Sequence, residues 1–216
     1  PQEVDNSWGL AGKNVKEFNI KEEMLDEAAM PLNKGSVKRW LPKLVGLFLF
    51  DLVWISAVAG RSEWLLVTLL LVSLQVALAI RSSAFSWRLY AVFVALGLAL
   101  EATVVGVGIL TFDGGFLPWW LILLWLGFAG MLMNTLSDLA GRPVWAALLG
   151  IASGPLTYAI GIRLGAAELL RAEWLLWVVY AVLWAIYMVI FALLMQRFVV
   201  AQPHSGSHTE GGHDEN

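Results

Sequence analysis

Hydrophobic residues occur in six long runs between residues 41 and 195, and short polar segments separate the runs. A bilayer core about 30 Å thick needs roughly 20 apolar residues per spanning helix, so runs of this length predict transmembrane helices. The predicted spans are 41–60, 63–80, 87–110, 117–139, 143–162 and 173–195. We therefore predict an all-α fold, a polytopic membrane helical bundle of about six transmembrane helices.

The composition supports a membrane location. Of the 216 residues, 59% are hydrophobic and 14% are charged, and the mean hydropathy of +0.71 lies well outside the range of soluble domains. The net charge of -3 is small, and no basic run is dense enough to follow a phosphate backbone, so nucleic acid is not an expected partner. The chain has no cysteine, which excludes disulfides and thiolate metal sites.

Polar segments flank the hydrophobic region and predict three parts: a polar cytoplasmic amino-terminal arm (1–40), a six-helix transmembrane domain (41–196) and a disordered cytoplasmic tail (197–216). In the arm, hydrophobic residues recur near helical spacing, which predicts a short surface helix. Most Lys and Arg residues close to the span ends would lie on the same side of the membrane as the amino terminus: Lys34, Lys38, Arg39, Lys43, Arg81, Arg88, Arg142 and Arg197. Only Arg61, Arg163 and Arg171 would lie near the span ends on the opposite side. This asymmetry predicts that both termini of the multi-pass protein lie in the cytoplasm.

Three carboxylates fall within the predicted spans, where a charged group is costly and normally faces the bundle interior. Asp51 lies near the middle of the first span and Glu101 near the middle of the third, on one helical face with Gly97. Two interpretations of Glu101 stay open: a proton-carrying or ligand-binding carboxylate, or a neutral acid that is hydrogen-bonded across helices. Asp138 lies close to the cytoplasmic end of the fourth span, so we expect water and Arg142 to satisfy it in a structural role.

Small and polar residues form one stripe on each of the fourth and fifth spans, at steps of three or four residues. The stripes are Gly127, Gly130, Asn134, Asp138 and Gly141, and Gly150, Gly154, Thr157, Gly161 and Gly165. Because small residues allow close approach, we expect these two helices to pack against each other, with Asn134, Ser153 and Thr157 able to hydrogen-bond across the contact. The alternative is that the stripes line a substrate groove.

The last span has an aromatic face, made of Trp177, Tyr180, Trp184, Tyr187 and Phe191. Such a face indicates packing or lipid contact rather than a cofactor site. No histidine precedes residue 204, so histidine-based metal sites, Ser-His catalysis and haem ligation by histidine are not expected in the membrane region. We therefore expect neither a metal nor another cofactor.

Several short segments carry a resemblance to a known family. They are Phe50-Asp-Leu-Val-Trp, Leu124-Trp-Leu-Gly-Phe-Ala, Asn134-Thr-Leu-Ser, Gly154-Pro-Leu-Thr-Tyr-Ala-Ile-Gly and Leu164-Gly-Ala. Over about residues 44–195 the chain resembles the bacterial inner-membrane family known as domain of unknown function 2878. The resemblance implies a helical membrane protein and supplies no established activity. Tyr158, in the most specific of these segments, is included in the candidate polar site.

These observations lead to a first hypothesis of a non-enzymatic membrane protein that binds lipid or a membrane partner. Membrane lipids are the expected partners, together with a second copy of the chain or another membrane protein. The alternative is a small proton-linked transporter, and a third hypothesis is an intramembrane lipid-modifying enzyme. The candidate polar site contains Glu101, Asp51, Asn134, Asp138, Thr157 and Tyr158.

Overall fold

The structure is a computed structural model and describes residues 34–200. The chain divides into two compact units, residues 1–41 and 42–216. Of the first unit, the structure describes the beginning of helix α2. The surface helix predicted in the arm and the histidine-bearing tail lie outside the described residues. The helical bundle belongs to the second unit.

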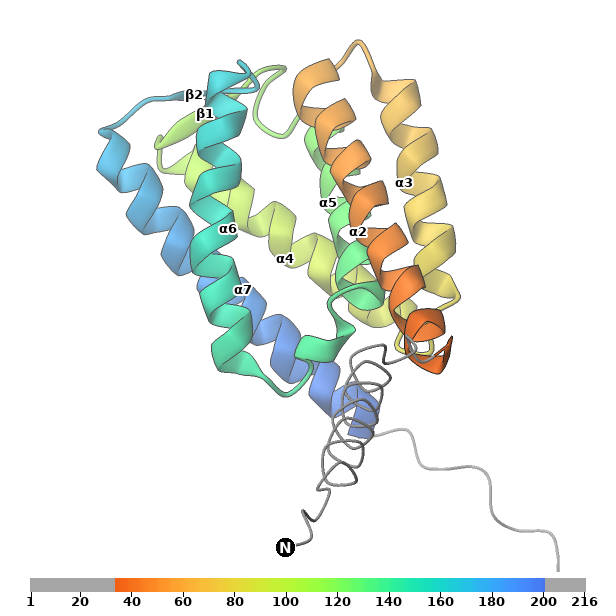
Figure 1. The fold of residues 1–216 in the computed structure, drawn as a ribbon. Helices are drawn as coiled ribbons and strands as arrows, with labels where there is room; N and C mark the ends of the chain where they lie inside the picture. The colour runs from red at the N-terminus through yellow and green to blue at the C-terminus, as the bar shows by residue number, and fades with distance from the viewer. Residues whose placement is uncertain (1–33, 201–216) are drawn as a thin grey trace, which may run out of the picture. The chain divides into compact units, whose positions relative to one another are not determined.

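Within residues 34–200 the chain forms six α-helices, a single turn of 3-10 helix and two short strands. The helices are α2 (Lys34–Gly60), α3 (Leu65–Ile80), α4 (Trp87–Gly106), α5 (Trp119–Asn134), α6 (Pro143–Arg163) and α7 (Glu173–Val200). Figure 1 shows that consecutive helices run alternately up and down. The predicted all-α bundle is therefore confirmed.

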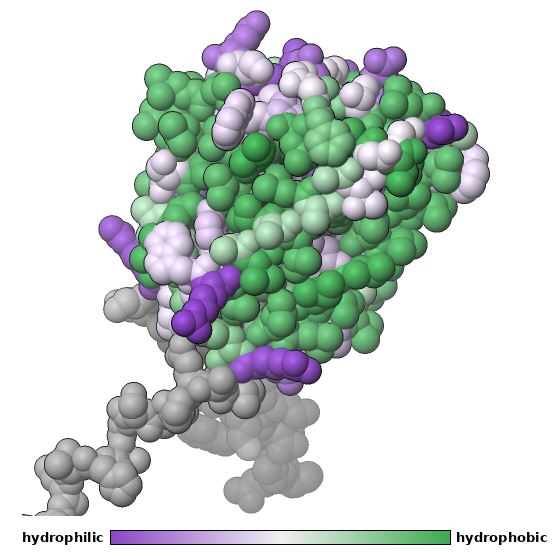
Figure 2. Space-filling model, turned by 180° about the vertical axis from the view of Figure 1, so that it is seen from behind, coloured by the Kyte–Doolittle hydropathy of each residue, from purple (hydrophilic) through white to green (hydrophobic). Residues whose placement is uncertain are grey.

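Four helices are long and apolar enough to cross a membrane: α2 from Trp40, α4, α6, and α7 as far as Phe198. Helices α3 and α5 have 16 residues each. They are about 24 Å long at 1.5 Å per residue, shorter than a hydrocarbon core of about 30 Å. On the face shown in Figure 2, hydrophobic residues cover the middle and hydrophilic residues gather mostly towards the two ends. This distribution is typical of a surface that contacts lipid.

The loops at one end of the bundle are more ordered than the sequence predicts. Helix α4 ends at Gly106 instead of residue 110, because the next residues form strand β1 (Leu110–Phe112), which pairs antiparallel with β2 (Ala167–Leu169). Two glycines with φ of 98° and 112°, Gly114 and Gly115, then turn the chain towards α5. At the other end, α5 stops at Asn134, and the 3-10 turn η1 (Ser137–Leu139) replaces the last turn of the predicted span.

The two small-residue stripes do not face each other, so the predicted pairing of the fourth and fifth spans is wrong. Helix α6 packs along α7, and α5 packs along α3. A Cβ atom added to Gly150 would lie 2.6 Å from the carbonyl oxygen of Trp184 on α7. A Cβ atom at Gly127 would lie 2.9 Å from Val53 on α2. Both stripes therefore allow another helix to come close, but the helix is α7 for the α6 stripe and α2 for the α5 stripe.

Two glycines of the α6 stripe take no part in close helix packing. A Cβ atom at Gly161 would meet no atom nearer than Val58 at 3.9 Å, which is an ordinary contact. Gly165 lies beyond the end of α6 with a φ of 74°, so it serves the turn that leaves the helix. Helical spacing predicts that Gly161 and Gly165 share a face with Gly150 and Gly154. In the structure, close helix packing is restricted to the part of α6 that contains Gly150 and Gly154.

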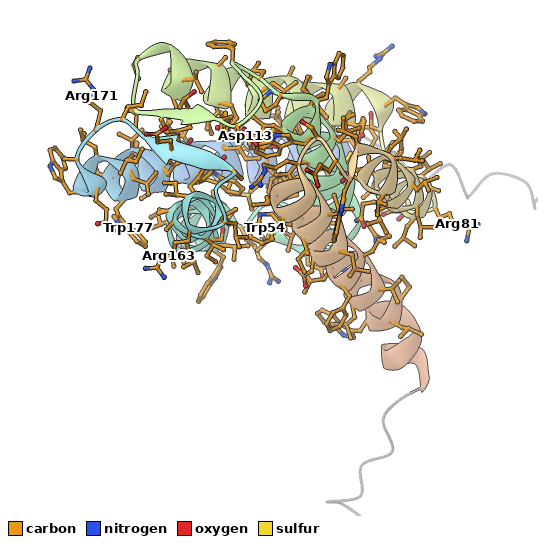
Figure 3. All side chains as sticks on the ribbon, turned by 90° about the horizontal axis from the view of Figure 1, so that it is seen from above. Trp54, Arg81, Asp113, Arg163, Arg171 and Trp177 are labelled. Atoms are coloured by element: carbon orange, nitrogen blue, oxygen red, sulfur yellow. The ribbon has the colours of Figure 1, made fainter. Side chains whose placement is uncertain are left out.

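The aromatic face of α7 forms much of the core. Tyr180, Trp184, Tyr187 and Phe191 are buried, whereas Trp177 is 41% exposed and lies on the outside of the bundle in Figure 3. The ring of Trp184 contacts Trp125 and Phe128 of α5 at centroid distances of 5.8 and 5.1 Å. This confirms packing as the role of most of that face.

Candidate functional site

A cavity of about 380 Å³ lies between α2 and α6. Figure 1 shows these two helices on either side of α5, which lies behind them. The lining is predominantly apolar and includes Val58 of α2, Trp125 and Phe128 of α5, Leu149 of α6, and Trp184 and Met188 of α7. The cavity is partly open, and Leu47 and Leu149 at its edge are each 39% exposed. We refer to this cavity as the α2–α6 groove.

Polar contacts join the loops at one end of the bundle. The guanidinium of Arg61, at the end of α2, donates a hydrogen bond to the Leu164 carbonyl oxygen (2.8 Å) and forms an ion pair with Asp113 (3.0 Å). Phe112 and Ala167, from the paired strands, line the groove at this end. The φ of Arg61 is 45°, in a region that non-glycine residues rarely adopt. These contacts therefore offset a local backbone strain.

At the opposite end of the bundle, α2 contacts the end of α5 and the turn that follows it. Lys43 forms an ion pair with Asp138. The Asn134 amide donates to the Pro42 carbonyl oxygen (3.3 Å), and the Thr135 hydroxyl donates to that of Lys43 (3.1 Å). The expected partner of Asp138, Arg142, is therefore replaced by Lys43. Asn134 also bonds to α2 instead of α6. Both residues hold helix ends together.

The polar side chains that line the groove lie on its two walls. Asp51 is on α2, and Ser153, Thr157 and Tyr158 are on α6. The hydroxyls of Ser153 and Thr157 donate to carbonyl oxygens of their own helix, at Leu149 and Ser153, both at 2.8 Å. The interhelical bonds predicted for them are therefore absent from the described residues.

Glu101 is fully buried and receives three hydrogen bonds from three different helices. The Trp125 indole on α5 donates to Oε1 (3.2 Å), and the Tyr180 hydroxyl on α7 donates to Oε2 (3.2 Å). The Tyr158 hydroxyl on α6 also donates to Oε1. The rings of Tyr158 and Tyr180 stack with centroids 3.6 Å apart, which fixes both hydroxyls on the carboxyl group. The Glu101 carboxyl therefore links α4 to α5, α6 and α7.

Gly97, one turn before Glu101, leaves room for a side chain from α5. A Cβ atom at Gly97 would lie 2.0 Å from the Trp125 ring, so only glycine leaves room for this side chain. The same indole reaches Glu101 one helical turn further along α4. Sequence reasoning missed Trp125 and Tyr180 as partners of Glu101. A signal existed for Tyr180, which belongs to the aromatic face of α7.

The structure divides the candidate polar site into three places. Glu101 and Tyr158 are in direct contact, Asp51 and Thr157 line the groove, and Asn134 and Asp138 contact α2 without lining the groove. Glu101 does not itself line the groove, because Trp125 and Tyr158 lie at the groove surface in its place. This geometry fits the interpretation of an acid hydrogen-bonded across helices. Among residues 34–200, no group of three or more His, Cys, Asp or Glu side chains could hold a metal ion.

A helical bundle with four membrane-length apolar helices and a groove in its side defines the class of this chain as a membrane protein. The chain belongs to the family described as "Protein of unknown function (DUF2878)", whose family model matches residues 43–190. The matched region contains the whole groove and the Glu101 cluster, and it confirms the family resemblance of the sequence. No curated protein and no solved structure matches the chain.

Proposed function

We propose that this chain is a multi-pass membrane protein that binds the apolar chain of a membrane lipid in the α2–α6 groove. The observation that carries the proposal is the form of the groove: its lining is predominantly apolar, and it is partly open between two helices. An apolar ligand that enters sideways from the bilayer need not pass a polar barrier.

The volume of the groove suits such a ligand. Binding sites for small molecules are mostly apolar cavities of about 300–1,000 Å³ with a few polar groups, and this groove has about 380 Å³. The aromatic side chains that α5 and α7 contribute to the groove lining are fixed by contacts with one another, such as that of Trp125 with Trp184. A preformed site avoids the entropic cost of ordering side chains on binding.

The proposed location is the bacterial inner membrane, with both termini in the cytoplasm. The support is the distribution of Lys and Arg near the helix ends. Lys43, Arg81 and Arg142 belong to one end of the bundle, and Arg61 and Arg171 belong to the other. An excess of Lys and Arg on one side favours that side as the cytoplasmic one.

Photocrosslinking tests the groove. The probe is a phosphatidylethanolamine with a diazirine in one acyl chain, reconstituted with the protein in vesicles, and crosslinked residues are mapped by mass spectrometry. We expect the groove residues Met131 and Met188 to be labelled above the lipid-facing background. Ser153→Phe should reduce this labelling at least severalfold, because the new ring occupies the groove.

Ser73→Phe is the matched control. Ser73 lies on the exposed face of α3, and its hydroxyl donates to the Leu69 carbonyl oxygen at 2.7 Å, as Ser153 donates to Leu149 at 2.8 Å. Both changes therefore remove the same kind of bond, but only one fills the groove. Labelling at Met131 and Met188 that is no higher than background, or that both variants reduce equally, would refute the proposal.

A further inference from the structure

Polar groups line the α2–α6 groove at the middle of its two walls. Asp51 lies near the centre of the membrane-length segment of α2, Trp40–Gly60, and Ser153 lies near the centre of α6. Trp54 is one turn from Asp51, and Figure 3 places it between α2 and α6. Thr157 is one turn from Ser153 on the opposite wall. In a bilayer these groups would lie far from both headgroup layers.

The hydrogen-bonding capacity of these groups is incompletely used. The indole nitrogens of two residues that line the groove, Trp54 and Trp184, are buried and have no hydrogen-bond partner in the described chain. Asp51 forms no hydrogen bond or ion pair with any other residue in the range 34–200. Ser153 and Thr157 use their hydroxyl protons within α6, so that their oxygens remain available only as acceptors. The residues lining the groove therefore hold two free indole donors and several free acceptors.

We infer that the groove selects a lipid chain that carries a hydroxyl group part-way along its length. A hydroxyl both donates and accepts, so it can receive the Trp54 N–H and donate to the Asp51 carboxyl or to an oxygen on α6. A carbonyl could accept from an indole but could not donate to Asp51, and a plain hydrocarbon would leave both indoles and the Asp51 carboxyl without a partner. The indole N–H groups are buried, whereas Asp51 is exposed. A buried polar group without a partner is costly, so the unpaired indole donors favour the hydroxylated ligand over the plain hydrocarbon.

This inference rests on the proposed function, and one pair of ligands separates the two. Methyl 12-hydroxystearate and methyl stearate differ by a single mid-chain hydroxyl. Each competes with the diazirine phospholipid for groove labelling of the full-length protein in vesicles. We expect the hydroxylated ester to compete at roughly tenfold lower concentration, the size of effect that one or two additional hydrogen bonds produce.

Two variants locate the source of the preference. Trp54→Phe keeps an aromatic ring but removes the free donor that lies one turn from Asp51, and Asp51→Leu removes the carboxyl acceptor; each should reduce the preference to about threefold or less. Trp177→Phe removes an indole N–H from the outside of α7 and should leave the preference unchanged.

The outcomes are distinct. Equal competition by the two esters overturns the inference and leaves the groove proposal intact, whereas failure of both esters to compete overturns the groove proposal. A preference that survives both Trp54→Phe and Asp51→Leu would also overturn the inference, because it would arise elsewhere.

Discussion

Replacing Gly150 by alanine tests the contact between α6 and α7. The new Cβ atom would lie 2.6 Å from the carbonyl oxygen of Trp184 and 2.8 Å from its carbonyl carbon, and ordinary contacts begin near 3.4 Å. Both obstructing atoms belong to the backbone of α7, so no side-chain rotation can relieve the clash. The two helices must separate by several tenths of an ångström along their contact.

Two opposing effects determine how much Gly150→Ala changes the free energy of unfolding. Overpacking of this kind costs about 1–3 kcal/mol, whereas alanine in a helix is favoured over glycine by about 0.5–1 kcal/mol. Gly161→Ala is the matched control, because it gains the same helical preference on the same helix and its Cβ atom meets only Val58, at 3.9 Å. The difference between the two variants isolates the clash, and we expect about 2 kcal/mol.

Thermal unfolding in detergent, followed by tryptophan fluorescence, measures this difference. For a chain of this size, about 2 kcal/mol corresponds to a Tm difference of about 4–8 °C. Gly161→Ala should melt at or slightly above the wild-type temperature, and Gly150→Ala below it. Equal melting temperatures for the two variants would refute the close approach of α6 to α7 at Gly150.

Two further predictions concern Glu101 and the membrane orientation. Glu101→Leu would leave three buried donors without an acceptor and should lower stability by about 3 kcal/mol or more, whereas Glu101→Gln retains an acceptor and should cost less; equal thermal unfolding of the two variants would contradict the hydrogen-bonded cluster. The chain has no native cysteine, so single cysteines at Ser62, Gly114 and Ser86 report orientation. A membrane-impermeant maleimide should label the first two in intact cells and spare Ser86, and the reverse pattern would refute the proposed topology.

The helices could be predicted from the sequence because their signals are local. Run length and hydropathy place six helices, and the beginnings of α4 at Trp87, α6 at Pro143 and α7 at Glu173 agree with the predicted starts. The glycines Gly114 and Gly115 likewise indicate a turn, which the structure forms with positive φ at both. A buried Glu101 also requires partners, whatever the arrangement of the helices.

The choice of partners was decided by the tertiary structure. A stripe of small residues indicates that some backbone comes close, but not which one, and α6 approaches α7 instead of α5. The pairing of β1 with β2 joins two three-residue segments from separate loops, too short for either to show a strand pattern alone. The same holds for the contacts of Arg61 with Asp113 and with Leu164. These residues come from three separate loops, so no single segment of the sequence indicates that they meet.

The groove and the Glu101 cluster likewise combine features that the sequence predicts with features that only the tertiary structure decides. The sequence by itself determined that carboxylates, hydroxyls and glycines lie within apolar helices, because side-chain chemistry and helical period are properties of each segment. Only the tertiary structure placed Asp51 at an apolar groove and Glu101 behind it, between Trp125, Tyr158 and Tyr180. Contacts between distant segments depend on how whole helices pack, and periodicity within one helix carries no information about its neighbours.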